Sequence, residues 1–184
     1  MAADTTPTTE PPTSSDGPCS YVLGDDGLAR WSDVHRDAWI GLLETHKRLT
    51  RMLDAELDAE HGLNISALEA LGRLAAAPEH KLGLSALTSA CGLSLSRISR
   101  IIDGLESRKL VERRTVACDA RAVEAQLTSD GLELARRAQC SHFAAVQRLF
   151  FAQLDDHEVA ELAAMFARFA PEAAEACTEH APAA

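Results

Sequence analysis

Residues 93–114, LSLSRISRIIDGLESRKLVERR, contain the clearest helical pattern of the chain. Four aliphatic residues in this stretch are spaced for one helix face: Ile98, Ile101, Ile102 and Leu105. At about 100° per residue, a 3-4-7 spacing of this kind anchors a helix in a hydrophobic core. We therefore predict a helix from about Ser94 to Arg108 with one buried face.

The opposite face of this predicted helix is polar. It carries Ser96, Arg100, Asp103 and Ser107, with Arg97, Ser99 and Gly104 beside them. An arginine among small hydroxyl residues suits a helix in a DNA major groove, because arginine can donate two hydrogen bonds to guanine and serine can reach a phosphate. The alternative is an ordinary solvated face, and this helix alone does not separate the two interpretations.

The segment before this helix has the outline of a helix-turn-helix. A short helix is predicted over Ser85–Cys91, and Gly92 supplies a tight turn before the longer helix. Further upstream, Ser66 and Glu69 have the spacing of a capping box, which predicts that a helix begins there and is closed by Pro78.

After the helix the pattern changes to that of a β-hairpin. Strands are predicted at Leu110–Thr115 and Val123–Leu127, and together they form a two-stranded wing. Near its tip, Asp119 can orient the guanidinium of Arg121, and a narrow minor groove attracts such an arginine through its negative potential. Two arginines on the first strand are candidates for contacts to flanking phosphates, Arg113 and Arg114. The alternative is a surface ion pair that adds little stability.

Long helices are predicted on both sides of this lobe. The first extends from Trp31 to about His61, and the last begins at a capping box formed by Asp155 and Glu158. Their apolar stripes exceed what a small winged-helix core can cover, so we expect a partner subunit. The expected fold is mainly α: a winged helix-turn-helix with a two-stranded β-hairpin wing and long N- and C-terminal dimerisation helices.

The expected domain boundaries follow from these elements. They are a disordered acidic tail rich in Pro, Thr and Ser at 1–28, an N-terminal dimerisation helix at 29–62, a DNA-binding lobe at 63–128, C-terminal dimerisation helices at 129–176 and a flexible tail at 177–184.

Composition narrows the class of protein. The chain has 184 residues, of which 46% are apolar and 4% aromatic, which favours an aliphatic, helical core. There is no signal-peptide pattern and no run near the roughly 18 apolar residues of a membrane span. The five cysteines are far apart in sequence, which is typical of neither a zinc ribbon nor a disulfide framework. We expect a cytoplasmic protein with reduced thiols.

The net charge of −10 taken alone disfavours a nucleic-acid partner, but the distribution of charge along the chain matters more. Between Ser94 and Arg121 there are seven cationic and four acidic residues, a local charge of +3. The remainder of the chain carries −13, so the positive charge is concentrated on the predicted helix and wing.

Two stretches together, 93–114 and ACDARAVEAQLTSDG at 117–131, resemble the MarR (multiple antibiotic resistance regulator) family in its recognition helix, its wing and its D-x-R-x(5)-LTxxG signature. The similarity extends from about Trp31 to Pro171. The resemblance implies a homodimer that binds double-stranded DNA at a pseudopalindromic operator and usually represses transcription. It implies DNA contacts from the hydroxyl residues Ser94, Ser96 and Ser99, a base-reading Arg100, an orienting Asp119 and a minor-groove Arg121.

Two positions depart from the family's pattern. Lys109 stands where the recognition helix usually ends on glycine, and a left-handed backbone there is strained for lysine. Ala120 stands where a first wing arginine is common, which predicts fewer phosphate contacts and a weaker salt dependence.

Family members typically release DNA when a small aromatic or phenolic ligand binds between the dimerisation helices and the DNA-binding lobe. Four residues of the first long helix are candidates to hold an aromatic carboxylate: Trp31, Trp39, His46 and Arg51. The alternative is that Trp39 and His46 pack in the core or the dimer seam.

One cysteine offers an alternative means of regulation. Cys118, beside Asp119 in the wing, suggests a redox-responsive regulator as an alternative, whereas Cys91 is interpreted as a core residue.

The seven histidines show no metal-binding spacing, so we expect neither a metal nor a cofactor. No phosphate loop or nucleophile elbow is present, which predicts that the chain is not an enzyme. A winged-helix module that contacts only proteins is a further alternative, and it would show no steep salt dependence on DNA.

Overall fold

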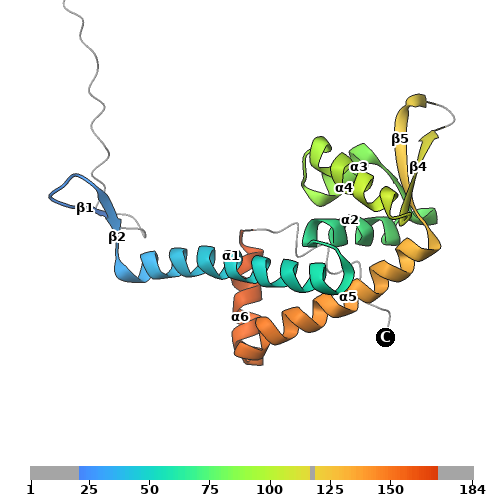
Figure 1. Cartoon of the computed structure of the whole chain (residues 1–184). Coiled ribbons are helices and arrows are strands. Elements are labelled where there is room, and N and C mark those ends of the chain that lie inside the picture. Colours follow the sequence, from blue (N-terminus) through green and yellow to red (C-terminus); the bar gives the residue numbers. More distant parts are fainter. Residues whose placement is uncertain (1–20, 117–118, 170–184) are drawn as a thin grey trace, which may run out of the picture. The chain divides into compact units, whose positions relative to one another are not determined.

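The structure, a computed structural model, describes the backbone of residues 21–116 and 119–169 and, except for 115–122, their side chains (Figure 1). Within these residues the chain divides into two units at Arg48 and Leu49, which are described separately. No helix of the described ranges combines the length and the apolar content that a membrane span requires.

The first unit contains a β-hairpin and the first part of a long helix. Strands β1 (Tyr21–Leu23) and β2 (Ala29–Trp31) pair antiparallel, and α1 (Asp33–His61) follows. Part of the segment predicted as tail is therefore a hairpin, and α1 begins two residues after Trp31, which pairs in β2. The sequence signal for this hairpin is the Asp26-Gly27 turn, where Gly27 has φ 73°.

The second unit holds the rest of α1 and all later elements. These are α2 (Ile65–Ala76), the 3-10 turn η1 (Pro78–His80), β3 (Lys81–Gly83), α3 (Leu84–Cys91), α4 (Leu95–Ser107), β4 (Val111–Val116), β5 (Asp119–Leu127), α5 (Ser129–Leu149), the 3-10 turn η2 (Phe151–Gln153) and α6 (Asp156–Ala167). The order confirms the mainly helical, winged helix-turn-helix prediction.

The wing has one strand more than predicted. The sheet order is β3-β5-β4, all antiparallel, with Lys81 opposite Gln126 and Val111 opposite Leu127. Strand β3 is three residues long, too short for alternation of apolar and polar side chains to show in the sequence. It fixes the base of the wing to the start of α3.

The core of the second unit lies under the helix-turn-helix. Its largest fully buried side chains are Leu71, Leu74, Leu87, Ile98, Ile102 and Val111. Leu105 is also buried and Ile101 partly so, which confirms the predicted inner face of α4. Because four aliphatic side chains of α4 pack into this core, the helix has one defined rotation about its axis.

Of the two capping boxes predicted from the sequence, the structure contains one. Ser94 caps α4, Thr128 caps α5, and Asp155 with Glu158 forms the capping box of α6. The prediction of Ser66 as the cap of α2 is wrong, because Asn64 accepts the hydrogen bond from Ala67 N (2.8 Å). Asn64 lies two residues upstream and is an equally good cap, so the spacing of Ser66 and Glu69 was not decisive.

Lys109 ends the recognition helix in the left-handed conformation, with φ 60°. We expect Lys109→Gly to raise the free energy of unfolding by about 1 kcal/mol, since the left-handed region is strained for residues with a Cβ. Urea denaturation measures the change. Lys109→Ala is the matched control, because it removes the same charge and keeps the strain; equal stabilisation by both variants would contradict the strain argument.

Candidate nucleic-acid interface

The turn between α3 and α4 fixes how α4 is presented. Gly92 has φ 61°, and its N–H donates to Ser89 O (3.3 Å) while Leu93 N donates to Thr88 O (3.2 Å). These bonds close the end of α3 in a left-handed turn that glycine adopts without strain. The next residue, Ser94, then caps α4 by accepting from Arg97 N (3.4 Å).

The outer face of α4 is exposed as predicted. Its exposed side chains include Ser96, Arg97, Arg100, Asp103 and Ser107, and Ser99 is half-buried at its edge. Arg100 Nε donates to Ser96 O at 3.3 Å, the one hydrogen bond recorded for this side chain among the described residues. Most of the donors of its guanidinium fork therefore remain directed to solvent, where a base edge or phosphate can accept from them.

Arg113 lies against α4. Its guanidinium donates to Ser99 O and Ser99 Oγ (3.2 Å each), to Glu106 Oε2 (3.4 Å) and to Asp103 Oδ1. Its backbone N–H also donates to Glu106 Oε1 (3.2 Å), and the side chain is only 27% exposed. These contacts join β4 to α4, and the predicted contact of Arg113 to a flanking phosphate stays a prediction.

The rest of the wing is described less completely. Arg114 is exposed and pairs with Glu112 (3.0 Å) on the same strand. The backbone of Asp119 pairs with Val116 at the tip of the wing. The side chains of Asp119 and Arg121 and the whole of Cys118 lie outside the described residues, so their roles stay predictions.

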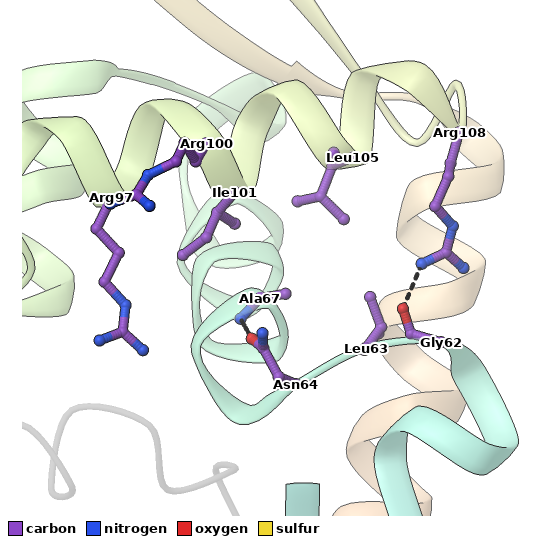
Figure 2. A pocket seen from close by; sticks show the side chains of 10 residues that line it. Gly62, Leu63, Asn64, Ala67, Arg97, Arg100, Ile101, Leu105 and Arg108 are labelled. Carbon is purple, nitrogen blue, oxygen red and sulfur yellow. Dashed lines mark hydrogen bonds between the residues drawn. The ribbon is translucent and has the colours of Figure 1, made fainter. Parts of the chain in front are cut away.

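A groove of about 490 Å³ lies between α4 and the segment that leads into α2 (Figure 2). Its lining residues are Gly62, Leu63, Asn64, Ala67, Arg97, Arg100, Ile101, Gly104, Leu105 and Arg108. Three of them are arginines and none is acidic, so the groove is suited to an anionic group such as a phosphate.

Two of these arginines also connect α4 to its neighbours. Arg97 donates to Ser66 Oγ on α2 (3.0 Å). Arg108 donates to the carbonyls of His61 (2.8 Å) and Gly62 (2.7 Å) at the end of α1. Sequence analysis missed Arg108, because its partners are 46 and 47 residues away and no local pattern marks such a contact.

The ligand-site candidates fall in different parts of the chain. Trp31 and Trp39 meet edge to face in the first unit, with ring centroids 6.2 Å apart. His46 is exposed on α1 in the same unit, and Arg51 is exposed in the second unit. The structure therefore brings the two tryptophans together, and the ligand site as a whole stays a prediction.

Two cysteines lie among the residues whose side chains are described, and they differ in exposure. Cys91 is buried as predicted, and burial, with a smaller effect from the Glu69 carboxylate, raises the pKa of its thiol. A raised pKa lowers thiolate reactivity. Cys140 is exposed on α5. Over the described ranges there is no group of three or more His, Cys, Asp or Glu side chains placed to hold a metal ion.

Comparisons with known proteins place this geometry in a family. A family model described as MarR family matches residues 61–122, which include the helix-turn-helix and most of the wing. AbsC, a MarR family transcriptional regulator from Streptomyces coelicolor, is 31% identical with a TM-score of 0.68, and the match covers 82% of this chain and 99% of AbsC. The chain belongs to the MarR family. It is a MarR-type DNA-binding transcriptional regulator, and this family is not one of enzymes.

Two further structures are similar to this MarR family chain. Sco3205 from Streptomyces coelicolor, a MarR family regulator solved in complex with DNA, is 27% identical with a TM-score of 0.71, over 77% of this chain and 89% of Sco3205. A mutant MarR from E. coli, complexed with operator DNA, is 20% identical with a TM-score of 0.63, over 74% of this chain and 95% of its own; at that identity it supports the fold alone. The search of curated proteins gave no match.

Proposed function

We propose that this chain is a repressor that binds a pseudopalindromic operator as a homodimer, with α4 in the major groove and the wing at the minor groove. The observation that carries the proposal is the two-sided character of α4. Ile98 and Ile102 are fully buried, while Ser96, Arg97 and Arg100 are exposed on the other side. A helix whose rotation is fixed by its core face can present the same polar side chains to every half-site.

Exposed apolar side chains on the terminal helices support the homodimer. In the first unit, Val34, Trp39, Ile40, Leu42 and Leu43 of α1 are exposed. In the second unit, α6 has no buried residue and exposes Met165 and Phe166. Faces of this kind are covered in a symmetric dimer, where each helix packs on the same helices of a second copy. A two-fold dimer presents two copies of α4, which matches a pseudopalindrome.

Release by a small aromatic or phenolic ligand completes the proposal. The edge-to-face pair of Trp31 and Trp39, both about half exposed, offers aromatic surface to such a ligand. We place the protein in the cytoplasm, where the operator is. Adding salicylate or benzoate to the protein–operator complex tests this part of the proposal. Trp31→Ala, which removes one ring of the pair and lies outside the proposed dimer face on α1, is expected to weaken the release without changing the affinity for DNA.

Selection of binding sites from random duplex DNA by the full chain tests the core of the proposal. We expect one enriched motif with two-fold symmetry, bound by two chains per duplex, and an affinity that falls steeply with salt. Transcription from a promoter that carries the motif then distinguishes repression from activation. A chain that enriches no sequence and shows a flat salt dependence is a protein-contact module instead.

Two neighbouring wing arginines should respond differently to substitution. Arg114→Ala is expected to lower the slope of log affinity against log salt by about 1, because Arg114 is exposed and can neutralise a phosphate. Arg113→Ala is expected to leave that slope unchanged and to lower the free energy of unfolding by about 1 kcal/mol, because its partners are in α4. Filter binding at several salt concentrations and urea denaturation measure the two effects.

A double-mutant cycle of Arg113→Ala with Asp103→Ala serves as the control for this assignment. We expect a coupling free energy of about 0.5–1 kcal/mol in the unfolding measurement. A fall in salt slope for Arg113→Ala as large as that for Arg114→Ala would instead assign Arg113 to the DNA.

A further inference from the structure

We propose that Arg108 is a positioning residue that fixes the recognition helix to the end of α1 and thereby sets the half-site spacing that the dimer accepts. This inference rests on the proposed function, because a spacing exists only for a dimer on a two-half-site operator. Arg108 itself need not touch DNA for this role.

The contact joins two helix ends. Arg108 is the C-cap residue of α4, and its two terminal nitrogens donate to the carbonyls of Gly62 (2.7 Å) and His61 (2.8 Å), as Figure 2 shows for the first of them. These carbonyls are at the C-terminus of α1, where unpaired acceptors and the helix dipole favour a cation. The planar guanidinium can bridge two acceptors with little loss of freedom per hydrogen bond.

The backbone at the end of α1 is held in place by hydrogen bonds and by buried residues. Gly62 has φ 63°, its N–H donates to Asp58 O (2.9 Å), and Leu63 N donates to Leu57 O (3.3 Å), which closes the helix in a left-handed turn. Leu57 and Leu63 are only 2% and 3% exposed. The two acceptor carbonyls are therefore held by buried residues on either side of them.

Further contacts connect the same end of α1 to α5. His61 Nε2 lies 2.9 Å from Ser141 Oγ, and one terminal nitrogen of Arg148 donates to both carboxylate oxygens of Glu56 at 2.7 and 2.8 Å. Both α1 and α5 are predicted to belong to the dimerisation part of the molecule. A displacement of either helix would therefore move the two carbonyls that accept hydrogen bonds from Arg108.

Three arginines connect α4 to three different neighbouring elements by hydrogen bonds. Arg97 donates to α2 and Arg113 holds β4, both within the DNA-binding lobe. Arg108 is the arginine of this set that reaches α1. Within the described residues, the loss of Arg108 therefore removes the polar contact between α4 and the predicted dimerisation helix while the other two arginine contacts remain.

The dependence of operator affinity on the spacing of the two half-sites is a sensitive measure of such a contact. One inserted base pair moves a half-site by about 3.4 Å and rotates it by about a tenth of a turn. A dimer with rigidly attached recognition helices cannot follow this change and loses contacts at one half-site. A dimer whose α4 has lost its attachment to α1 adapts more easily, so its affinity depends less on spacing.

The experiment uses the full chain and the operator obtained by selection, with the half-site spacing kept, shortened by one base pair or lengthened by one. For the parent we expect the affinity to fall on the order of tenfold or more at the changed spacings. For Arg108→Ala we expect weaker binding at the selected spacing and a fall of roughly threefold or less at the others. Arg108→Lys, which keeps a donor of the same charge, should recover part of the parent's spacing preference.

Arg137→Ala is the matched control. Arg137 is exposed on α5, and its recorded partner is Glu133 one turn away (3.9 Å) on the same helix, so the variant removes one positive charge without separating two elements. We expect it to keep the parent's ratio of affinities. A loss of folded protein lowers binding at every spacing alike and leaves this ratio unchanged, so the ratio reports positioning and not stability.

The outcomes separate the inference from the function on which it rests. A parent-like ratio for Arg108→Ala overturns the role of Arg108 and leaves the repressor proposal intact, since the parent still binds its operator. A parent that binds a two-fold operator equally well at all three spacings also overturns the inference. A parent that selects no duplex sequence contradicts the proposed function and the inference with it.

Discussion

Arg100→Ala is expected to lower the affinity for the operator by about 1–3 kcal/mol, roughly 5- to 150-fold, and to relax the base preference at one position of each half-site. Arg100 is exposed at the centre of the outer face of α4, and its only recorded hydrogen bond among the described residues is to Ser96 O (3.3 Å). A guanidinium with its fork directed to solvent can donate two hydrogen bonds to the edge of a guanine.

Competition between the operator and its single-base variants measures this effect. Arg100→Lys separates base reading from phosphate binding, because it keeps the charge and removes the planar fork. Arg73→Ala is the charge-matched control, since Arg73 is exposed on α2 and pairs with Glu69 (3.5 Å) one turn away. If Arg100→Lys keeps both the affinity and the base preference of the parent, Arg100 contacts a phosphate and reads no base.

The elements that the sequence predicted well are those with local signals. The isoleucine spacing of α4, the capping box of Asp155 and Glu158 and the turn at Gly92 each depend on residues within a few positions of one another. Their physical chemistry is contained in one or two helical turns, so a single sequence is enough to recognise them. The same is true of the wing strands β4 and β5, which alternate over several residues.

The elements that the sequence did not predict depend on distant partners or on very short patterns. Arg100, Arg108 and Arg113 look equivalent in sequence, yet one faces solvent, one holds α1 and one holds α4 to β4. Only the tertiary arrangement separates these roles, because an arginine can donate to any acceptor within its long reach. Strand β3 was missed for a different reason, since three residues carry no periodicity.

Gly131 shows how the family signature LTxxG combines a local and a distant requirement. Thr128 Oγ1 accepts from Gly131 N (3.0 Å) as the cap of α5, and Thr128 N donates to Leu110 O (3.1 Å). These hydrogen bonds hold the first turn of α5 in close contact with the backbone between α4 and β4. A Cβ on Gly131 would lie 1.9 Å from Leu110 O and 2.9 Å from Leu110 C, distances that no side chain can occupy. A glycine is therefore required at this position because the backbone of Leu110 leaves no room for a Cβ, and not because of the φ angle of Gly131.

Gly131→Ala is accordingly expected to lower the free energy of unfolding by about 3 kcal/mol or more, because the contact atoms belong to backbone and cannot move aside cheaply. Gly72→Ala is the matched control. Gly72 also lies inside a helix, α2, and a Cβ there meets nothing within 4 Å, so the better helix propensity of alanine should stabilise the protein by about 0.5–1 kcal/mol. Urea denaturation of the two variants should thus give changes of opposite sign. Stabilisation by both would mean that α5 can shift away from Leu110 at no cost, and the LTxxG glycine would then need another explanation.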